Sequence, residues 1–245
     1  MRVLAIALCA VLGSAADAQA QSPLVGELRA VATRYHEDPP RLDRLYHGLA
    51  EAVKTDSHLD NFLALAQICF IWGDIRAKTT EDKLEAYDRG RQAAKRAVEL
   101  APRNALAHFW HATNAGRWGQ TKGVMRSLFL LPTVKEGMQT AIDLDPKLTG
   151  AYSLAGTVLY EVPGLLGGDL DKSEEMFRKG LDLDPKFTGL RVGLAKTLIK
   201  RKRFDEARRQ LRAVLDEKEP RNPADWTMKD SKQARELLES LKGKS

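Results

Sequence analysis

One short phrase recurs along this 245-residue chain and limits its fold more than any other feature. It reads AVELAP at 97–102, AIDLDP at 141–146 and GLDLDP at 180–185, and a weaker copy ends at Pro220. Proline lacks the N–H donor and cannot continue the interior of a helix, so each phrase predicts a helix end followed by a turn. The four prolines are 44, 39 and 35 residues apart. These spacings equal the roughly 34-residue period of a helix-turn-helix repeat plus insertions of about ten, five and one residue.

The residues between these prolines are typical of two amphipathic helices per repeat. Apolar side chains recur at positions i, i+3 and i+4 over 151–159, and a second apolar stripe over 176–183 leads to Pro185. Small residues stand at the same place in each phrase and predict close approach of neighbouring helices: Ala97, Ala141 and Gly180. The sequence shows no convincing strand-like alternation. We therefore expect an all-α helix-turn-helix repeat solenoid.

Several side chains also stand where a known repeat family has its signature residues. They are Tyr152, Gly156, Leu194, Ala195, Phe204, Ala207 and Leu211. With these residues the chain, from Leu59 to Pro220, resembles the tetratricopeptide repeat family. Two copies depart from the pattern. The copy ending at Pro146 has Val134 and Met138 in place of the usual alanine and bulky aromatic residue, and the copy ending at Pro102 lacks a clear first-helix signature. The resemblance implies a superhelix of stacked helix pairs.

Two narrower resemblances exist within that family. The stretch YEVPGLLGGDLDKSEEMF at 160–177, followed by GLDLDP, resembles the T-component associated with periplasmic TRAP transporters. That likeness implies a periplasmic solute-binding protein as partner and a hydrophobic ligand. The phrases AVELAP and AIDLDP and their spacing more distantly resemble regulators of microtubule dynamics.

The chain divides into four expected regions. Residues 1–20 have an arginine, an apolar run of about eleven residues and a small-residue end, which predicts a signal peptide cleaved after Ala20. Residues 21–58 are expected to form an N-terminal helix pair or a degenerate first repeat. The repeats extend over 59–221 with insertions near 117–134 and 161–169, and 222–245 forms a capping helix that covers the last repeat. The protein is therefore expected in the periplasm or secreted.

If the chain is exported, its cysteine count and its charge limit which disulfides and which partners are possible. After cleavage only Cys69 remains, so an intramolecular disulfide is excluded and the thiol is expected to be a small buried hydrophobic group. The net charge of +6 is carried by 188–245, which contains sixteen Lys and Arg against nine Asp and Glu. Nucleic acid is a poor candidate partner for an exported chain. An acidic protein surface or a lipid headgroup fits this charge better.

Neither of two candidate motifs supports catalysis. The glycine-rich stretch PGLLGGDLDKS at 163–173 places Asp169 and Asp171 where a phosphate-binding loop needs cationic and N–H groups. It is expected to be a long turn in which one of these aspartates caps the next helix, and a binding role for the protruding loop is the alternative. His108 and His111 form an H-x-x-H pair without the further ligands that a metal centre needs. We predict no catalytic residue, no metal and no cofactor.

Two further segments have both a structural and a functional interpretation. The run KRKR at 200–203 is expected to be a solvated turn between helices, and the alternative is a docking site for an acidic partner or headgroup. The insertion at 117–134 is rich in both apolar and basic residues. We expect it to fold back onto the repeats, because an exposed apolar patch promotes aggregation. If it is exposed instead, it is the best candidate for oligomer or partner contacts.

The favoured function is that of a non-enzymatic scaffold with a concave binding groove. The helical period places eight residues on the inner face: Phe109, Thr113, Arg117, Ser153, Thr157, Tyr160, Lys196 and Lys200. The lysines favour an acidic segment, and the aromatic residues favour apolar contact. A partner protein, a peptide or a small apolar ligand would fit this groove. A metal-dependent enzyme and a peripheral membrane module are the alternatives.

Overall fold

The computed structural model describes residues 22–244, so the expected signal peptide and its cleavage after Ala20 lie outside the described residues. Within that range the chain is helical and contains no strand, which confirms the expected all-α solenoid. The elements in chain order are α1 (Pro23–Val31), α2 (Arg41–Thr55), α3 (Leu59–Ile75), α4 (Thr80–Leu100), α5 (Ala105–Lys122), α6 (Val124–Leu144), α7 (Thr149–Glu161), the short 3-10 turn η1 (Gly164–Leu166), α8 (Leu170–Leu183), α9 (Thr188–Lys200), α10 (Phe204–Asp216), α11 (Pro223–Asp225), the π-helical turn η2 (Trp226–Asp230) and α12 (Ser231–Ser240).

The repeated phrases end helices where the sequence predicts. Helices α4, α6 and α8 end at Leu100, Leu144 and Leu183, each two residues before a proline. The small residue in each phrase is buried against a neighbouring helix. A Cβ on Gly180, for example, would lie 2.8 Å from Leu190 Cδ1, so a larger residue would push α8 away from α9. Close helix packing therefore explains the small residues.

Helices pack in adjacent pairs, α3 with α4, α5 with α6, α7 with α8, and α9 with α10. The pairs share two apolar cores. One core lies among the helices from α1 through α5. It contains Cys69, which is fully buried as expected. The other joins α8, α9, α10 and α12 around Phe177 and Leu194.

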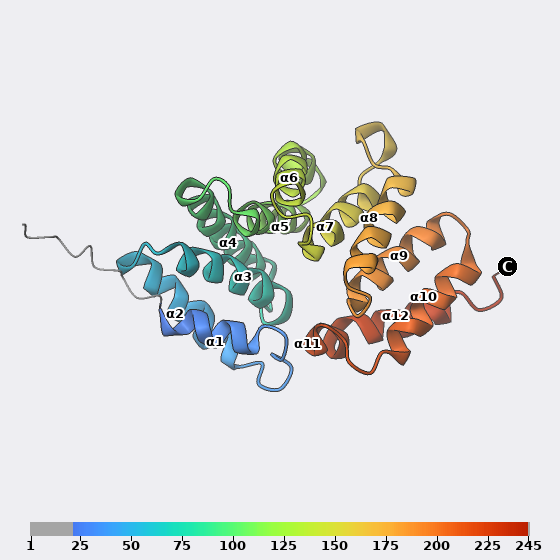
Figure 1. Cartoon of the computed structure of the whole chain (residues 1–245), viewed down its shortest axis with the longest axis horizontal. Helices are drawn as coiled ribbons and strands as arrows, with labels where there is room; N and C mark the ends of the chain where they lie inside the picture. Colours follow the sequence, from blue (N-terminus) through green and yellow to red (C-terminus); the bar gives the residue numbers. More distant parts are fainter. Residues whose placement is uncertain (1–21, 245) are drawn as a thin grey trace, which may run out of the picture.

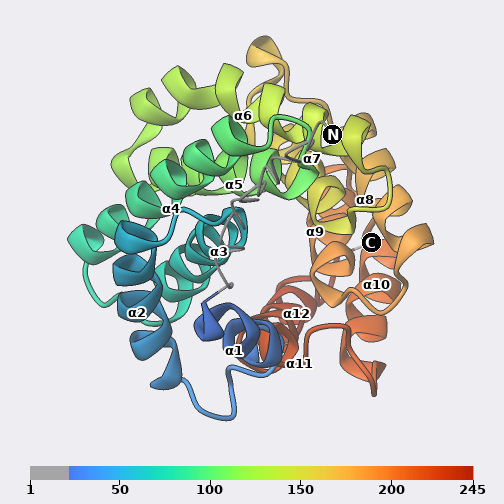
Figure 2. The ribbon, with the colours of Figure 1, turned by 60° about the vertical axis from the view of Figure 1, so that its left-hand side comes forward.

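The superhelix closes on itself. Figure 1 shows α11 beside α1, although they stand at opposite ends of the described chain. The amide N of Ala224 donates to the Thr33 carbonyl over 2.9 Å, and the buried Ala224 side chain belongs to the N-terminal core. In Figure 2 the result is a ring, with α3, α5, α7, α9 and α12 around its inside and the second helix of each pair on its outside. The C-terminal segment therefore joins the two ends of the repeat array.

The insertion at 117–134 does not fold back, contrary to our expectation. It lengthens α5 and α6 into a helical hairpin that turns at Gly123, where φ is 116°. Val124, Met125 and Phe129 are 75%, 80% and 73% exposed. The helix α6 continues through the exposed Pro132. The exposed alternative is therefore correct for the turn of the hairpin, whereas Trp118, Leu128, Leu130 and Leu131 are half-buried.

The glycine-rich segment at 163–173 is a turn, not a phosphate loop. Gly167 has φ of 88°, which favours glycine, and a Cβ on Gly168 would collide with the Val162 carbonyl. The carboxylate of Asp169 accepts from the amides of Asp171 and Lys172 at 2.9 and 3.0 Å and caps α8. Of the two expected caps, Asp169 is the one that the structure uses.

Candidate binding site on the inner face of the ring

Three of the predicted inner-face residues surround one small cavity. Thr157 and Tyr160 of α7 and Lys196 of α9 line a space of about 110 Å³. The C-terminal segment closes this space with Asp230 of η2 and Gln233 of α12. We call it the inner cavity.

The inner cavity contains charges of both signs. Burial lowers the pKa of the Lys196 ammonium, although Glu161 and Asp230 act in the opposite direction. Burial also raises the pKa of Asp230 to about 6, against the effect of the Thr188 hydroxyl, which donates to this carboxylate over 2.7 Å. Sequence reasoning identified Lys196 and missed both carboxylates. Glu161 lies at the end of the predicted α7 stripe, whereas Asp230 comes from the returning C-terminal segment and has no signal in the repeat pattern.

Lys200 contacts Tyr160 instead of pointing freely into the groove. Its ammonium donates to the Tyr160 carbonyl over 2.8 Å and lies 3.8 Å from the centroid of the Tyr160 ring. A cation over an aromatic face is attracted by the ring quadrupole. On α7, the helix of Tyr160, the Thr157 hydroxyl donates to the Ser153 carbonyl over 2.8 Å. Lys200 therefore helps to fix the wall of the inner cavity.

The three predicted residues on α5 lie outside the inner cavity. The Phe109 ring packs against the Trp110 ring, with 4.7 Å between the two centroids. The buried Thr113 hydroxyl has no hydrogen-bond partner among the described residues, and an unsatisfied buried hydroxyl of this kind suits an added water or ligand group. Arg117 donates to Asp74 on α3. Three of the eight predicted residues therefore line the inner cavity, and the three on α5 lie outside it.

Arg117 belongs to a chain of charged groups that crosses the ring closure. Asp74 accepts from Arg117 and from the Tyr87 hydroxyl at 2.7 Å, and lies 3.7 Å from the Lys229 ammonium. Lys229 pairs with Asp225 at 2.7 Å.

Asp225 in turn accepts from the Tyr35 hydroxyl over 2.5 Å, a contact between residues 190 positions apart. Burial alone would raise the pKa of Asp74, but Arg117 and Lys229 outweigh it and hold that pKa below its ordinary value. We call this group, made of Tyr35, Asp74, Arg117, Asp225 and Lys229, the charged seam. It ties α3 and α5 to the C-terminal segment.

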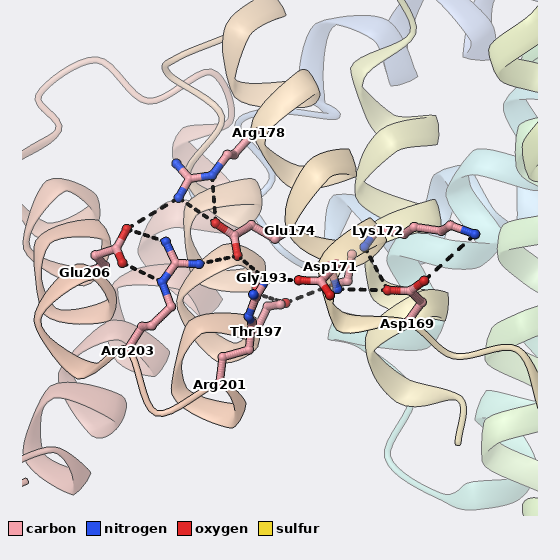
Figure 3. Close-up of polar contacts among 11 residues, drawn as sticks. Asp169, Asp171, Lys172, Glu174, Arg178, Gly193, Thr197, Arg201, Arg203 and Glu206 are labelled. Atoms are coloured by element: carbon pink, nitrogen blue, oxygen red, sulfur yellow. Dashed lines mark hydrogen bonds and ion pairs between the residues drawn. The ribbon is translucent and has the colours of Figure 1, made fainter. Parts of the chain in front are cut away.

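Two of the four cations in the basic turn at 200–203, Arg201 and Arg203, form internal ion pairs. Figure 3 shows the buried Glu174 carboxylate between Arg178 and Arg203, which pair with it at 2.7 and 2.6 Å. Arg201 pairs with Glu174 at 2.8 Å and with Asp171 at 2.5 Å. Since these cations already have carboxylate partners, they stabilise the packing of α8 on α9 and α10. This turn is therefore a weaker candidate for docking an acidic partner than the sequence suggested.

The histidine pair on α5 has local roles. The Nε2–H of His108 donates to the Pro102 carbonyl over 2.8 Å, and burial lowers the pKa of His111. Within residues 22–244, no three His, Cys, Asp or Glu side chains gather as a metal ion would require. Over the same residues, no helix has the length and apolar character needed to cross a bilayer.

Comparison with known proteins agrees with this architecture. Residues 165–226 match the tetratricopeptide repeat family. The structure is similar to the crystal structure of a thermophilic TPR protein of Thermus thermophilus, with a TM-score of 0.64 and 20% identity over 88% of this chain and 99% of that one. A crystal structure of MamA covers 81% of this chain and 96% of its own, at 16% identity and a TM-score of 0.49. The first of these likenesses confirms the repeat fold.

The N-terminal part has a more specific match. Over 107 residues the chain is 29% identical to Regulator of microtubule dynamics protein 2 of Macaca fascicularis, covering 40% of this chain and 26% of that protein. The chain therefore aligns with about a quarter of that relative. Residues 28–166 match the family of regulator of microtubule dynamics proteins 1–3, which is more than half of the sequence. The distant resemblance seen in the sequence is thus confirmed, and the chain belongs to this family, with a tetratricopeptide-like repeat fold.

Proposed function

We propose that this protein is a non-enzymatic, exported scaffold that binds an extended segment of a partner protein on the inner face of its ring. Repeat scaffolds of this architecture generally present a concave surface to protein partners. The observation that supports the proposal is the inner cavity, which opens among Thr157, Tyr160 and Lys196.

The size of the inner cavity favours a peptide over a free small ligand. Sites for small molecules usually have volumes of about 300–1,000 Å³. At about 110 Å³ the inner cavity has room for a single side chain. Lys196 offers N–H donors, and Glu161 and Asp230 offer acceptors. A polar side chain of the partner, such as an amide or hydroxyl, can satisfy both kinds of group.

The location and identity of the partner are parts of the proposal that rest on the sequence. The leader pattern at 1–20 supports export, and an exported scaffold meets its partners in the periplasm or outside the cell. The resemblance of 160–177 to transporter T-components supports a transporter component, such as a solute-binding protein, as that partner.

Affinity capture from cell-envelope extract tests the proposal. Wild-type protein is compared with Thr157→Trp, which fills the inner cavity, and with Lys196→Glu combined with Lys200→Glu. We expect each variant to lose a specific co-purifying protein, seen by mass spectrometry, while circular dichroism shows unchanged helix content. The matched control is Lys218→Glu with Lys232→Glu, two exposed lysines that do not line the inner cavity. Equal capture by all four proteins would remove the inner cavity as the binding site.

A further inference from the structure

The turn of the α5–α6 hairpin combines exposed apolar side chains with cations. Val124, Met125 and Phe129 are 75%, 80% and 73% exposed, and Lys122 and Arg126 are exposed beside them. We call these five residues the hairpin tip. Large exposed apolar groups of this kind are uncommon on a protein surface that has no partner.

The sequence on both sides of the hairpin tip carries charge of one sign. Between Glu99 and Glu136 the sequence contains five Lys and Arg residues and no Asp or Glu. Arg117 is used by Asp74, and Lys135 donates to the Leu166 carbonyl over 3.1 Å. Among residues 22–244, by contrast, no carboxylate pairs with Lys122 or Arg126. These two cations are available to an anionic partner.

Backbone groups add no net charge at this turn. Helix α6 begins at the hairpin tip, but α5 ends there too, with Gly123 between the two helices. The partial positive charge of one helix end and the partial negative charge of the other offset each other. The attraction for anions therefore comes from Lys122 and Arg126.

A second turn on the α6 side also exposes an apolar side chain. The side chain of Leu165 in η1 is fully exposed, and the Lys135 contact holds this turn against α6. Figure 1 shows α6 and the turn before α8 along the same upper edge of the molecule. These apolar side chains, 73% to 101% exposed, therefore protrude from elements on one edge of the molecule.

We infer that the hairpin tip docks onto an anionic lipid surface. A protruding apolar side chain needs a matching pocket on a protein partner, whereas the interface of a bilayer accepts it without one. In this arrangement Met125 and Phe129 enter the boundary between headgroups and acyl chains, and Lys122 and Arg126 contact lipid phosphates. This surface is separate from the inner cavity, so lipid docking and partner binding can occur on one molecule.

Vesicle co-sedimentation of the full chain tests this inference. Wild-type protein is expected to bind vesicles of phosphatidylcholine with phosphatidylglycerol more strongly than phosphatidylcholine alone, and added salt should weaken this binding by screening the charges. Reversing two cations with Lys122→Glu and Arg126→Glu should weaken binding by about tenfold or more. Met125→Ser with Phe129→Ser should also reduce it.

Matched controls separate the hairpin tip from general surface effects. Lys218→Glu with Lys232→Glu changes net charge equally, and Leu106→Ser with Leu183→Ser removes two other exposed apolar side chains. Both control proteins should bind as wild type does. All variants share residues 1–21, so the differences between them report on the hairpin tip alone.

An environment-sensitive dye gives a local readout. In a Cys9→Ser background, the dye is attached at Met125→Cys or, as a control, at Thr227→Cys. Anionic vesicles should shift emission to the blue at position 125 and leave position 227 unchanged. The inference is wrong if position 125 gives no shift, or if the charge-reversed tip binds vesicles as strongly as wild type. It is also wrong if the tip variants instead convert an oligomer to a monomer, because a second copy of the chain would then cover this surface.

Discussion

The charged seam and the hairpin tip use cations of the same helix in opposite ways. Arg117 and Lys122 both lie in the last turns of α5. Arg117 meets Asp74, whose side chain is only 9% exposed, whereas no described carboxylate reaches Lys122. A cation with a buried partner holds the fold together, and one without a partner remains free to bind an anion. Position in the three-dimensional arrangement, and not residue type, separates the two roles.

Removing Asp74 should have the largest effect of the changes considered. Asp74→Ala leaves Arg117 and Lys229 without their shared carboxylate, and breaking a buried ion pair in this way typically costs about 3–5 kcal/mol. We expect the melting temperature to fall by about 10 °C, as calorimetry would show. The double variant Asp74→Ala, Arg117→Ala should lose less than the sum of the two single variants. Simple additivity, or a loss below about 1 kcal/mol, would show that the seam is not a coupled unit.

Asp230 contrasts with Asp74. Both carboxylates are buried, but at Asp230 the effect of burial on the pKa exceeds that of the nearby cations. Its pKa of about 6 lies above the ordinary value of 3.8, so the fold favours the neutral form. The resulting stabilisation is fully present below pH 3.8 and is lost as the pH rises through 6. Asp230→Asn keeps an acceptor for Thr188 and should raise the free energy of unfolding at pH 7.5 by up to about 3 kcal/mol. Denaturant titrations at pH 4 and 7.5 check this, and a gain of equal size at both values would contradict it.

Tyr35 tests the end of the charged seam. Tyr35→Phe removes the hydroxyl that donates to Asp225 and keeps the buried ring. The expected loss is about 1.5–3 kcal/mol in the free energy of unfolding, because the acceptor is charged. Tyr46→Phe is a suitable control on α2, since it is also a buried tyrosine of the N-terminal core. Equal losses in the free energy of unfolding for both variants would mean that the hydrogen bond to Asp225 adds no stability of its own.

The hairpin tip should show the smallest effect on stability. Met125→Ser with Phe129→Ser removes side chains that are already exposed in the folded state. Surface changes of this kind usually stay within about 0.5 kcal/mol. Thermal unfolding without vesicles measures this change in stability. A loss well above about 1 kcal/mol would show that these side chains pack against the protein and are not free to bind.

Local residue patterns predict the helix pairs and their ends. Proline at 102, 146 and 185 and small residues such as Gly180 determine where helices stop and approach each other, so these features can be inferred from the sequence. Thr157, Tyr160 and Lys196 could likewise be placed on one face by helical period. Asp230 and Lys229 reach the inner face only because the superhelix curves back on itself. That curvature is the sum of small rotations between many helix pairs, and no local pattern encodes it.

The hairpin tip was misjudged for a related reason. We expected the apolar insertion to fold back, because an exposed apolar patch promotes aggregation. Instead, α5 and α6 have 18 and 21 residues, against 13 and 14 in the next pair, α7 and α8, and the apolar side chains at their shared turn stay exposed. Composition indicates that Phe129 and Met125 favour an apolar environment. It does not indicate whether the protein itself provides that environment.

The separation of the two ends of the repeat array tests ring closure most directly. Spin labels at Thr33→Cys and Thr227→Cys, both exposed positions beside the closure, report this distance by double electron-electron resonance. Cys9 is replaced by Ser, and the fully buried Cys69 remains. The closed ring predicts one narrow population of short distances, which broadens towards longer distances when Asp74→Ala is added. A broad population of long distances in the otherwise wild-type chain would contradict closure by the charged seam.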